Sequence, residues 1–110
     1  MALKHAQSLD VIDVRPLGSG LRDAMTTSLL KTQALQLMRL VLAAGQSVPE
    51  HSVQGAITVQ CLEGKTILTT PSRTCELHAG ELVMLDGGEL HAVTAVTDSS
   101  LLLTVLLHTR

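Results

Sequence analysis

The chain has 110 residues, of which 45% are hydrophobic and only 16% charged. This length allows one domain with one core, and a net charge of −2 argues against a phosphate-backbone partner, so no nucleic acid is expected. The absence of Phe, Tyr and Trp also excludes sites that stack bases or cage cations on aromatic rings.

Few charges and a mean hydropathy of +0.34 predict apolar surface that a single chain leaves uncovered. Burial of that surface in a homodimer is the expected outcome. No run approaches the roughly 18 apolar residues that cross a bilayer, so no membrane partner is expected. The polar start has no signal-peptide pattern, and two cysteines, Cys61 and Cys75, are too few for a disulfide framework. We therefore expect a cytoplasmic protein with reduced thiols.

The N-terminal third gives mixed signals. Residues 1–8 are expected to form a loose leader, Leu9–Val14 to form a first strand, and Thr26–Lys31 a second. Thr32–Ala44 consists largely of good helix formers, so propensity favours a helix. Its alternation leaves neither face cleanly polar, and the local pattern does not decide between helix and strand.

From residue 45 onward the signals indicate β-structure. Ala56–Glu63 places Ile57, Val59 and Cys61 on one face, and the Glu63-Gly64 turn predicts a hairpin with Lys65–Thr70. Further short strands are expected at Arg73–Leu77, Leu82–Leu85, Leu90–Val96 and Leu101–Leu107. Leu101–Leu107 is apolar apart from Thr104, which predicts burial on both faces or a subunit contact. Six short strands with turn signals between them are typical of an all-β sandwich or barrel.

The glycines and histidines of this region follow a known pattern. Gly45, His51 and Gly64, followed by Gly80, Asp86, Gly88 and His91, resemble the two motifs of the cupin superfamily, with the short spacing of small bacterial cupins. The resemblance covers about residues 34–107 of a single domain spanning 1–110. It implies an all-β double-stranded β-helix, a jelly-roll barrel, and hence a strand at 32–44.

The resemblance also implies a place for a divalent metal ion, usually held by two histidines and a glutamate from the first motif and a histidine from the second. His51 and His91 match two of these positions, whereas Val53 and Ile57 stand at the other two. Protein metal sites usually have three or more side-chain ligands, so weak or no metal binding is expected. Cys61 is the nearest candidate for a third ligand, and Gln54 and Glu89 are candidates at the rim.

The predicted function is the binding of a small-molecule ligand in an apolar barrel. The residues expected to line the site or orient the ligand are Arg39, His51, Val53, Ile57, Val59, Gln60 and His91. One alternative is a metal-dependent enzyme, dioxygenase- or isomerase-like, with a reduced ligand set. Another is a structural protein whose barrel is filled by side chains. The sequence leaves open whether the two histidines converge or each bonds separately to the backbone.

Overall fold

A computed structural model describes residues 5–107, which form nine β-strands and one short 3-10 helix. The elements are η1 (Gly18–Asp23), β1 (Thr27–Lys31), β2 (Leu35–Leu42), β3 (Ser47–His51), β4 (Ile57–Glu63), β5 (Lys65–Thr69), β6 (Thr74–His78), β7 (Leu82–Leu85), β8 (His91–Ala95) and β9 (Ser99–Leu106). Within these residues no helix is long and apolar enough to cross a membrane.

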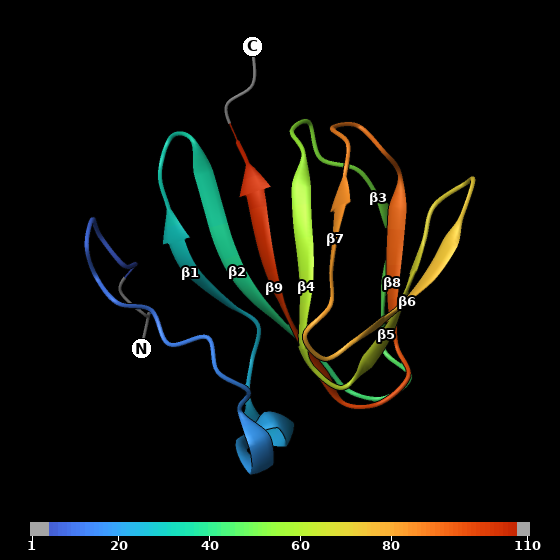
Figure 1. Cartoon of the computed structure of the whole chain (residues 1–110), viewed down its shortest axis with the longest axis horizontal. Helices are drawn as coiled ribbons and strands as arrows, with labels where there is room; N and C mark the ends of the chain where they lie inside the picture. Colours follow the sequence, from blue (N-terminus) through green and yellow to red (C-terminus); the bar gives the residue numbers. More distant parts are fainter. Residues whose placement is uncertain (1–4, 108–110) are drawn as a thin grey trace.

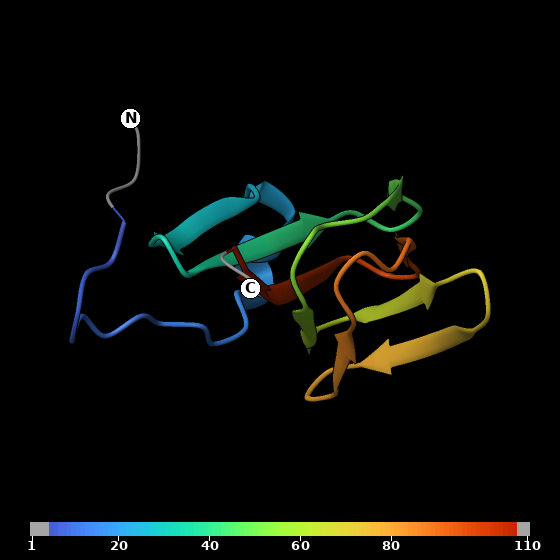
Figure 2. The same cartoon turned by 90° about the horizontal axis from the view of Figure 1, so that it is seen from above.

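The strands form two antiparallel sheets that face each other (Figures 1 and 2). One sheet has five strands in the order β1-β2-β9-β4-β7, and the other has four in the order β3-β8-β5-β6. Inward-facing side chains of both sheets meet in one core, formed by Leu42, Ile57, Val59, Cys61, Leu68, Leu77, Leu85, Val93, Ala95 and Leu101. The predicted all-β jelly-roll fold is confirmed.

β2 is a strand in spite of its helix-forming composition. It lies between β1 and β9, so neighbours on both sides satisfy its backbone groups. Its even-numbered side chains from Gln36 to Leu40 face the inside of the barrel, while Arg39 faces outward. Helix propensity differs by less than about 1 kcal/mol per residue among ordinary residues, so burial between two strands overrides it.

The predicted hairpin at Glu63-Gly64 is wrong. β4 pairs with β7 and β9 in the five-stranded sheet, whereas β5 pairs with β6 and β8 in the other sheet. Gly64 has φ +88° and lies against the backbone of Asp98 and Ser99, where the chain passes from one sheet to the other. A turn signal between two strands therefore marks a sheet crossing here, and the true hairpin joins β5 to β6.

No strand forms at Leu9–Val14, contrary to prediction. Leu9 has φ +73°, and the side chains of Leu9 and Val11 are 98% exposed. Residues 1–4 of the expected leader lie outside the described residues. Residues 5–8 are tied to β1, because the Ala6 N–H donates to the Leu29 carbonyl and His5 bonds to the Ser28 hydroxyl.

Residues 5–17, called here the N-terminal arm, are held on the outer side of the five-stranded sheet (Figure 2). Buried Arg39 of β2 donates from Nη1 to the carbonyl of Arg15 (3.0 Å) and from Nη2 to that of Asp13 (3.2 Å). Glu63 of β4 accepts the Leu17 N–H at 2.9 Å, where the arm runs into η1. Two buried or half-buried charges therefore anchor the arm through its backbone.

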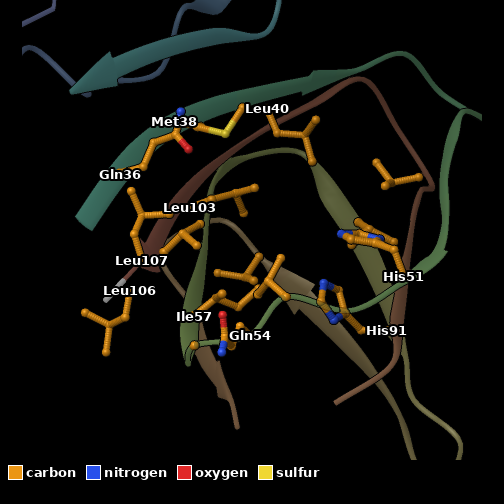
Figure 3. A pocket seen from close by; sticks show the side chains of 16 residues that line it. Gln36, Met38, Leu40, His51, Gln54, Ile57, His91, Leu103, Leu106 and Leu107 are labelled. Carbon is orange, nitrogen blue, oxygen red and sulfur yellow. The ribbon is translucent and has the colours of Figure 1, made fainter. Parts of the chain in front are cut away.

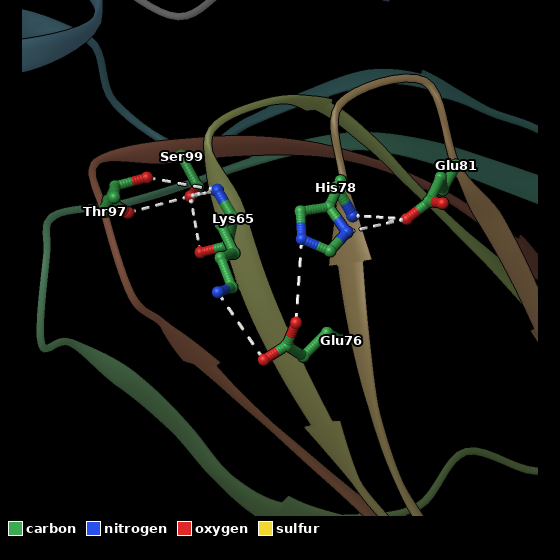
Figure 4. A network of polar contacts seen from close by, with 6 residues as sticks. All are labelled: Lys65, Glu76, His78, Glu81, Thr97 and Ser99. Carbon is green, nitrogen blue, oxygen red and sulfur yellow. Dashed lines mark hydrogen bonds and ion pairs between the residues drawn. The ribbon is translucent and has the colours of Figure 1, made fainter.

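A polar network at the end of β6 is structural (Figure 4). The Glu81 carboxylate accepts the backbone N–H of His78 at 2.8 Å and lies 3.1 Å from the His78 Nδ1. These two contacts hold the pKa of Glu81 below its usual value. Lys65 and His78 both approach Glu76, at 3.5 and 3.6 Å. All four side chains are partly or largely exposed, so the network fastens the turn before β7 and contributes little to stability.

Candidate functional site

A cavity of about 470 Å³ lies between the two sheets (Figure 3). Its wall is formed by Gln36, Met38, Leu40, Val48, His51, Val53, Gln54, Gly55, Ile57, Val59, His91, Val93, Leu103, Val105, Leu106 and Leu107. Twelve of these sixteen residues are aliphatic, methionine or glycine. Small-molecule sites commonly have volumes of about 300–1,000 Å³ and apolar walls with a few polar groups, so this cavity has the size and character of a ligand site.

The two histidines lie side by side on one wall of the cavity (Figure 3). β3 pairs with β8 in a register that sets His51 opposite His91. Their ring centroids are 4.4 Å apart, and the ring planes are tilted by 58°. His91 is 3% exposed, whereas His51 lies on the exposed edge strand β3. The sequence motifs therefore bring together two side chains that are far apart along the chain.

The same local hydrogen bond orients both rings. Nδ1 of His51 lies 2.9 Å from the Pro49 carbonyl, and Nδ1 of His91 lies 2.9 Å from the Glu89 carbonyl. A carbonyl oxygen only accepts, so each Nδ1 carries the hydrogen and donates it. In the neutral ring, Nε2 is then an acceptor with a free lone pair. Convergence and backbone bonding, the two alternatives from the sequence, are therefore both realised.

Edge strand β3 is what presents His51 to the cavity. Pro49, two residues before this histidine, lies inside the strand. Proline lacks an N–H, and a strand at the edge of a sheet tolerates it because one side of the strand needs no partner. The register is irregular between Val48 and His51, which turns the His51 ring toward the same face as His91.

The predicted lining residues divide by strand face. Val53, Ile57 and Val59 line the cavity as expected. Gln60 is next to Val59 on β4 and points to the other face of the sheet, so it does not line the cavity. Arg39 likewise lies on the outer face of β2, where it binds the N-terminal arm. The structure does not bring Gln60 or Arg39 to the site, because adjacent residues of a strand face opposite ways.

Cys61 is also absent from the cavity wall, although it faces inward. Its thiol is fully buried and donates to the carbonyls of Glu63 and Gly64 at 3.4 and 3.5 Å. Burial raises the pKa of this thiol, which disfavours the thiolate that would bind a metal. Cys61 therefore packs in the core between the two sheets. Glu89 borders a different hollow with Cys75 and Met84, whereas Gln54 does line the cavity.

Several lining residues were not predicted as site residues, notably Met38 and Leu40 of β2 and Leu103 and Val105 of β9. Their alternation along each strand was visible in the sequence. The sequence did not indicate whether the odd-numbered or the even-numbered residues of these strands face inward, because both faces of β2 and β9 are largely apolar.

Comparison with known families decides what this barrel is. The model of the cupin domain family matches residues 38–107, well over half of the chain. The chain belongs to the cupin family. No curated protein matches the sequence.

Several solved structures share the architecture at low sequence identity. A cupin superfamily protein from Desulfitobacterium hafniense is 19% identical with a TM-score of 0.77, over 94% of this chain and 100% of that one. A Streptococcus pyogenes protein of unknown function is 22% identical with a TM-score of 0.76, over 100% and 97%. A predicted oxalate decarboxylase from Thermotoga maritima is 24% identical with a TM-score of 0.67, over 76% and 79%. At these identities the likeness establishes the fold alone.

The residues of this cupin do not fit a tightly held metal ion. Within residues 5–107, no group of three or more histidine, cysteine, aspartate or glutamate side chains is close enough together to hold one. His51 and His91 offer two imidazoles, while Val53 and Ile57 line the same cavity with hydrocarbon. Protein-bound zinc and related ions usually have three or four protein ligands. No chemical step through a metal is therefore derived for this site.

Proposed function

We propose that this cupin is a binding module that holds a small, largely apolar molecule in its barrel. The supporting observation is the cavity of about 470 Å³, walled by aliphatic side chains and carrying two adjacent imidazoles with free acceptor positions. Burial of apolar ligand surface supplies affinity at roughly 25 cal/mol per Å², and the few polar groups orient the ligand. The open cavity supports this proposal over the alternative of a purely structural barrel filled by its own side chains.

Filling the cavity is expected to abolish binding. We choose 1-N-phenylnaphthylamine as an uncharged apolar probe whose fluorescence rises in an apolar site. The wild-type chain should bind one probe per cavity. Met38→Trp places an indole in the cavity wall and should weaken binding at least tenfold, because the added ring occupies the ligand's volume.

Leu37→Trp is the matched control, since Leu37 neighbours Met38 on β2 and is not part of the cavity wall. It should bind the probe as the wild type does. The probe is excited at a wavelength longer than those that indole absorbs, so that the added tryptophan does not contribute to the signal. No binding by the wild type, or equal loss in both variants, would contradict the proposal. Far-ultraviolet circular dichroism would confirm that each variant is folded.

We further propose that the chain pairs with a second copy through the outer side of the five-stranded sheet. A compact monomer of 11.7 kDa is expected to expose roughly 5,900 Å². This chain exposes 7069 Å², about 1,200 Å² more, whereas a standard interface buries about 800 Å² per partner. The excess includes Leu82 and Met84 of β7, which are 59% and 60% exposed, and Leu9 and Val11 of the N-terminal arm.

Both cysteines are unpaired, which is compatible with the cytoplasmic location that we propose from the sequence.

Sedimentation equilibrium tests the homodimer. The wild-type chain should sediment as a dimer, and Leu82→Lys/Met84→Lys should shift it to a monomer by placing two charges in the interface. Leu90→Lys is the control, because Leu90 is 42% exposed and lies outside the five-stranded sheet. A monomeric wild type at concentrations well above micromolar would rule the dimer out.

A further inference from the structure

We infer that the cavity selects an uncharged ligand carrying a hydroxyl group at one end of an apolar body. This inference rests on the proposed function and names the ligand class for the same cavity. It follows from which polar groups line the wall, which of their atoms are already bonded, and the absence of charge around them.

The first step concerns charge. None of the sixteen residues in the cavity wall is Lys, Arg, Asp or Glu. A carboxylate, phosphate or ammonium group that entered the cavity would leave water without a permanent countercharge in the wall, which disfavours its binding. Arg39 and Arg73 do not change this, because Arg39 binds the N-terminal arm on the outer face and Arg73 borders a different hollow. The wall therefore favours a neutral ligand.

The second step concerns the direction of the hydrogen bonds. The ring N–H of His51 and that of His91 each donate to a backbone carbonyl. In the neutral state both rings therefore present only the acceptor Nε2 for a further hydrogen bond. The Gln36 amide N–H₂ donates to the Ser28 hydroxyl at 2.9 Å, so one of its donors is also in use. Gln54 is exposed and lies at the rim. The histidine end of the cavity thus offers acceptors and needs a donor.

The third step concerns position. The two ring centroids are 4.4 Å apart, so both acceptors serve one head group rather than two separate ones. The surrounding wall, including Val53, Val93 and Val48, is aliphatic and contacts the body of the ligand by burial alone. An O–H group meets this arrangement, because it donates one hydrogen and carries no charge. An ether or a carboxylate would bring acceptor atoms against acceptor atoms.

A series of naphthalene ligands with one body and different head groups tests the inference. Binding of 2-naphthol, 2-methoxynaphthalene, 2-naphthoate and 2-naphthylmethylammonium would be measured by isothermal titration calorimetry, with EDTA present to remove stray metal ions. One hydrogen bond contributes about 0.5–1.5 kcal/mol, so 2-naphthol should bind roughly two- to thirteenfold tighter than 2-methoxynaphthalene. The two charged compounds should bind more weakly than either.

The double variant His51→Leu/His91→Leu assigns the preference to the imidazoles. It should bind 2-naphthol and 2-methoxynaphthalene equally, while keeping affinity for the second. The four-compound comparison on the wild type stands alone if this variant does not fold. Binding of all four compounds without preference, or tightest binding of 2-naphthoate, would overturn the hydroxyl inference and leave the binding function intact. Failure of every compound to bind, 2-methoxynaphthalene included, would instead count against the proposed function and this inference with it.

Discussion

Gly64→Ala is expected to cost about 4 kcal/mol or more of the free energy of unfolding, a large part of the roughly 5–15 kcal/mol that stabilises a typical domain. Gly64 has φ +88°, a conformation that side chains with a Cβ rarely adopt. A Cβ there would lie 2.8 Å from Cα of Ser99 and closer still to the Asp98 carbonyl oxygen and the Ser99 hydroxyl. Two of these atoms belong to the backbone, so the clash is relieved only by moving the strand that carries them.

Gly80→Ala is the matched control for this prediction. Gly80 has φ +90°, yet nothing lies within 4 Å of the position a Cβ would take. Only the left-handed conformation is then penalised, at roughly 1–2 kcal/mol. Urea unfolding of both variants, followed by far-ultraviolet circular dichroism, measures the difference. Equal losses at the two positions would show that the sheet crossing at Gly64 is looser than the structure indicates.

The role of Gly64 also illustrates what the sequence could predict. The resemblance to cupins, which rests on the glycine and histidine spacing, predicted the barrel and a strand at 32–44. It placed His51 and His91 at motif positions, while the sequence left open whether their rings converge. The same local signal at Glu63-Gly64 suggested a hairpin. Pairing between β4 and β9, or β5 and β8, is set by contacts distant in sequence, and no local pattern contains it.

The site residues that were wrongly assigned share one cause. Arg39 and Gln60 belong to strands whose two faces are both half-buried or apolar. The alternation of side chains along these strands therefore did not indicate which face of the strand lines the cavity. Arg39 looked like a ligand-binding charge in an apolar run. Its guanidinium instead binds two carbonyls of the N-terminal arm, a segment for which the sequence predicted a strand. The arm's packing had to be known before the role of Arg39 could be assigned.

The carboxylate of Glu63 is the second anchor of that arm, and its contacts decide its pKa. Burial alone would raise the pKa of Glu63, but the backbone N–H groups of Leu17 and Gly18 and the Ser100 hydroxyl outweigh it and hold the pKa below its usual value. The positive charge of Arg39 acts in the same direction. All of these donors favour the ionised form, so the folded state stabilises the carboxylate of Glu63 over its protonated acid.

Glu63→Gln is therefore expected to lower the free energy of unfolding by about 2 kcal/mol at pH 7, the range for hydrogen bonds to a charged group. The amide would also set its N–H₂ against a backbone N–H of Leu17 or Gly18. Since the pKa of Glu63 is lower in the folded than in the unfolded state, its stabilisation is fully present above the unfolded value near 4.3. It is lost as the pH falls below that value and through the folded pKa. The gap between wild type and variant should accordingly be widest near pH 7 and should narrow as the pH falls toward 3.

Urea unfolding from pH 7 to pH 3 measures that gap, and Glu50→Gln, at an exposed glutamate of β3, supplies the control. The control should follow the wild type at every pH. Amide hydrogen exchange adds a local readout, because loss of the carboxylate should speed exchange at Leu17 and Gly18 while the N–H groups of β9 keep their protection. A gap that stays constant as the pH falls would show that Glu63 acts by packing and not by charge. Unchanged exchange at Leu17 and Gly18 would show that Arg39 alone suffices to hold the arm.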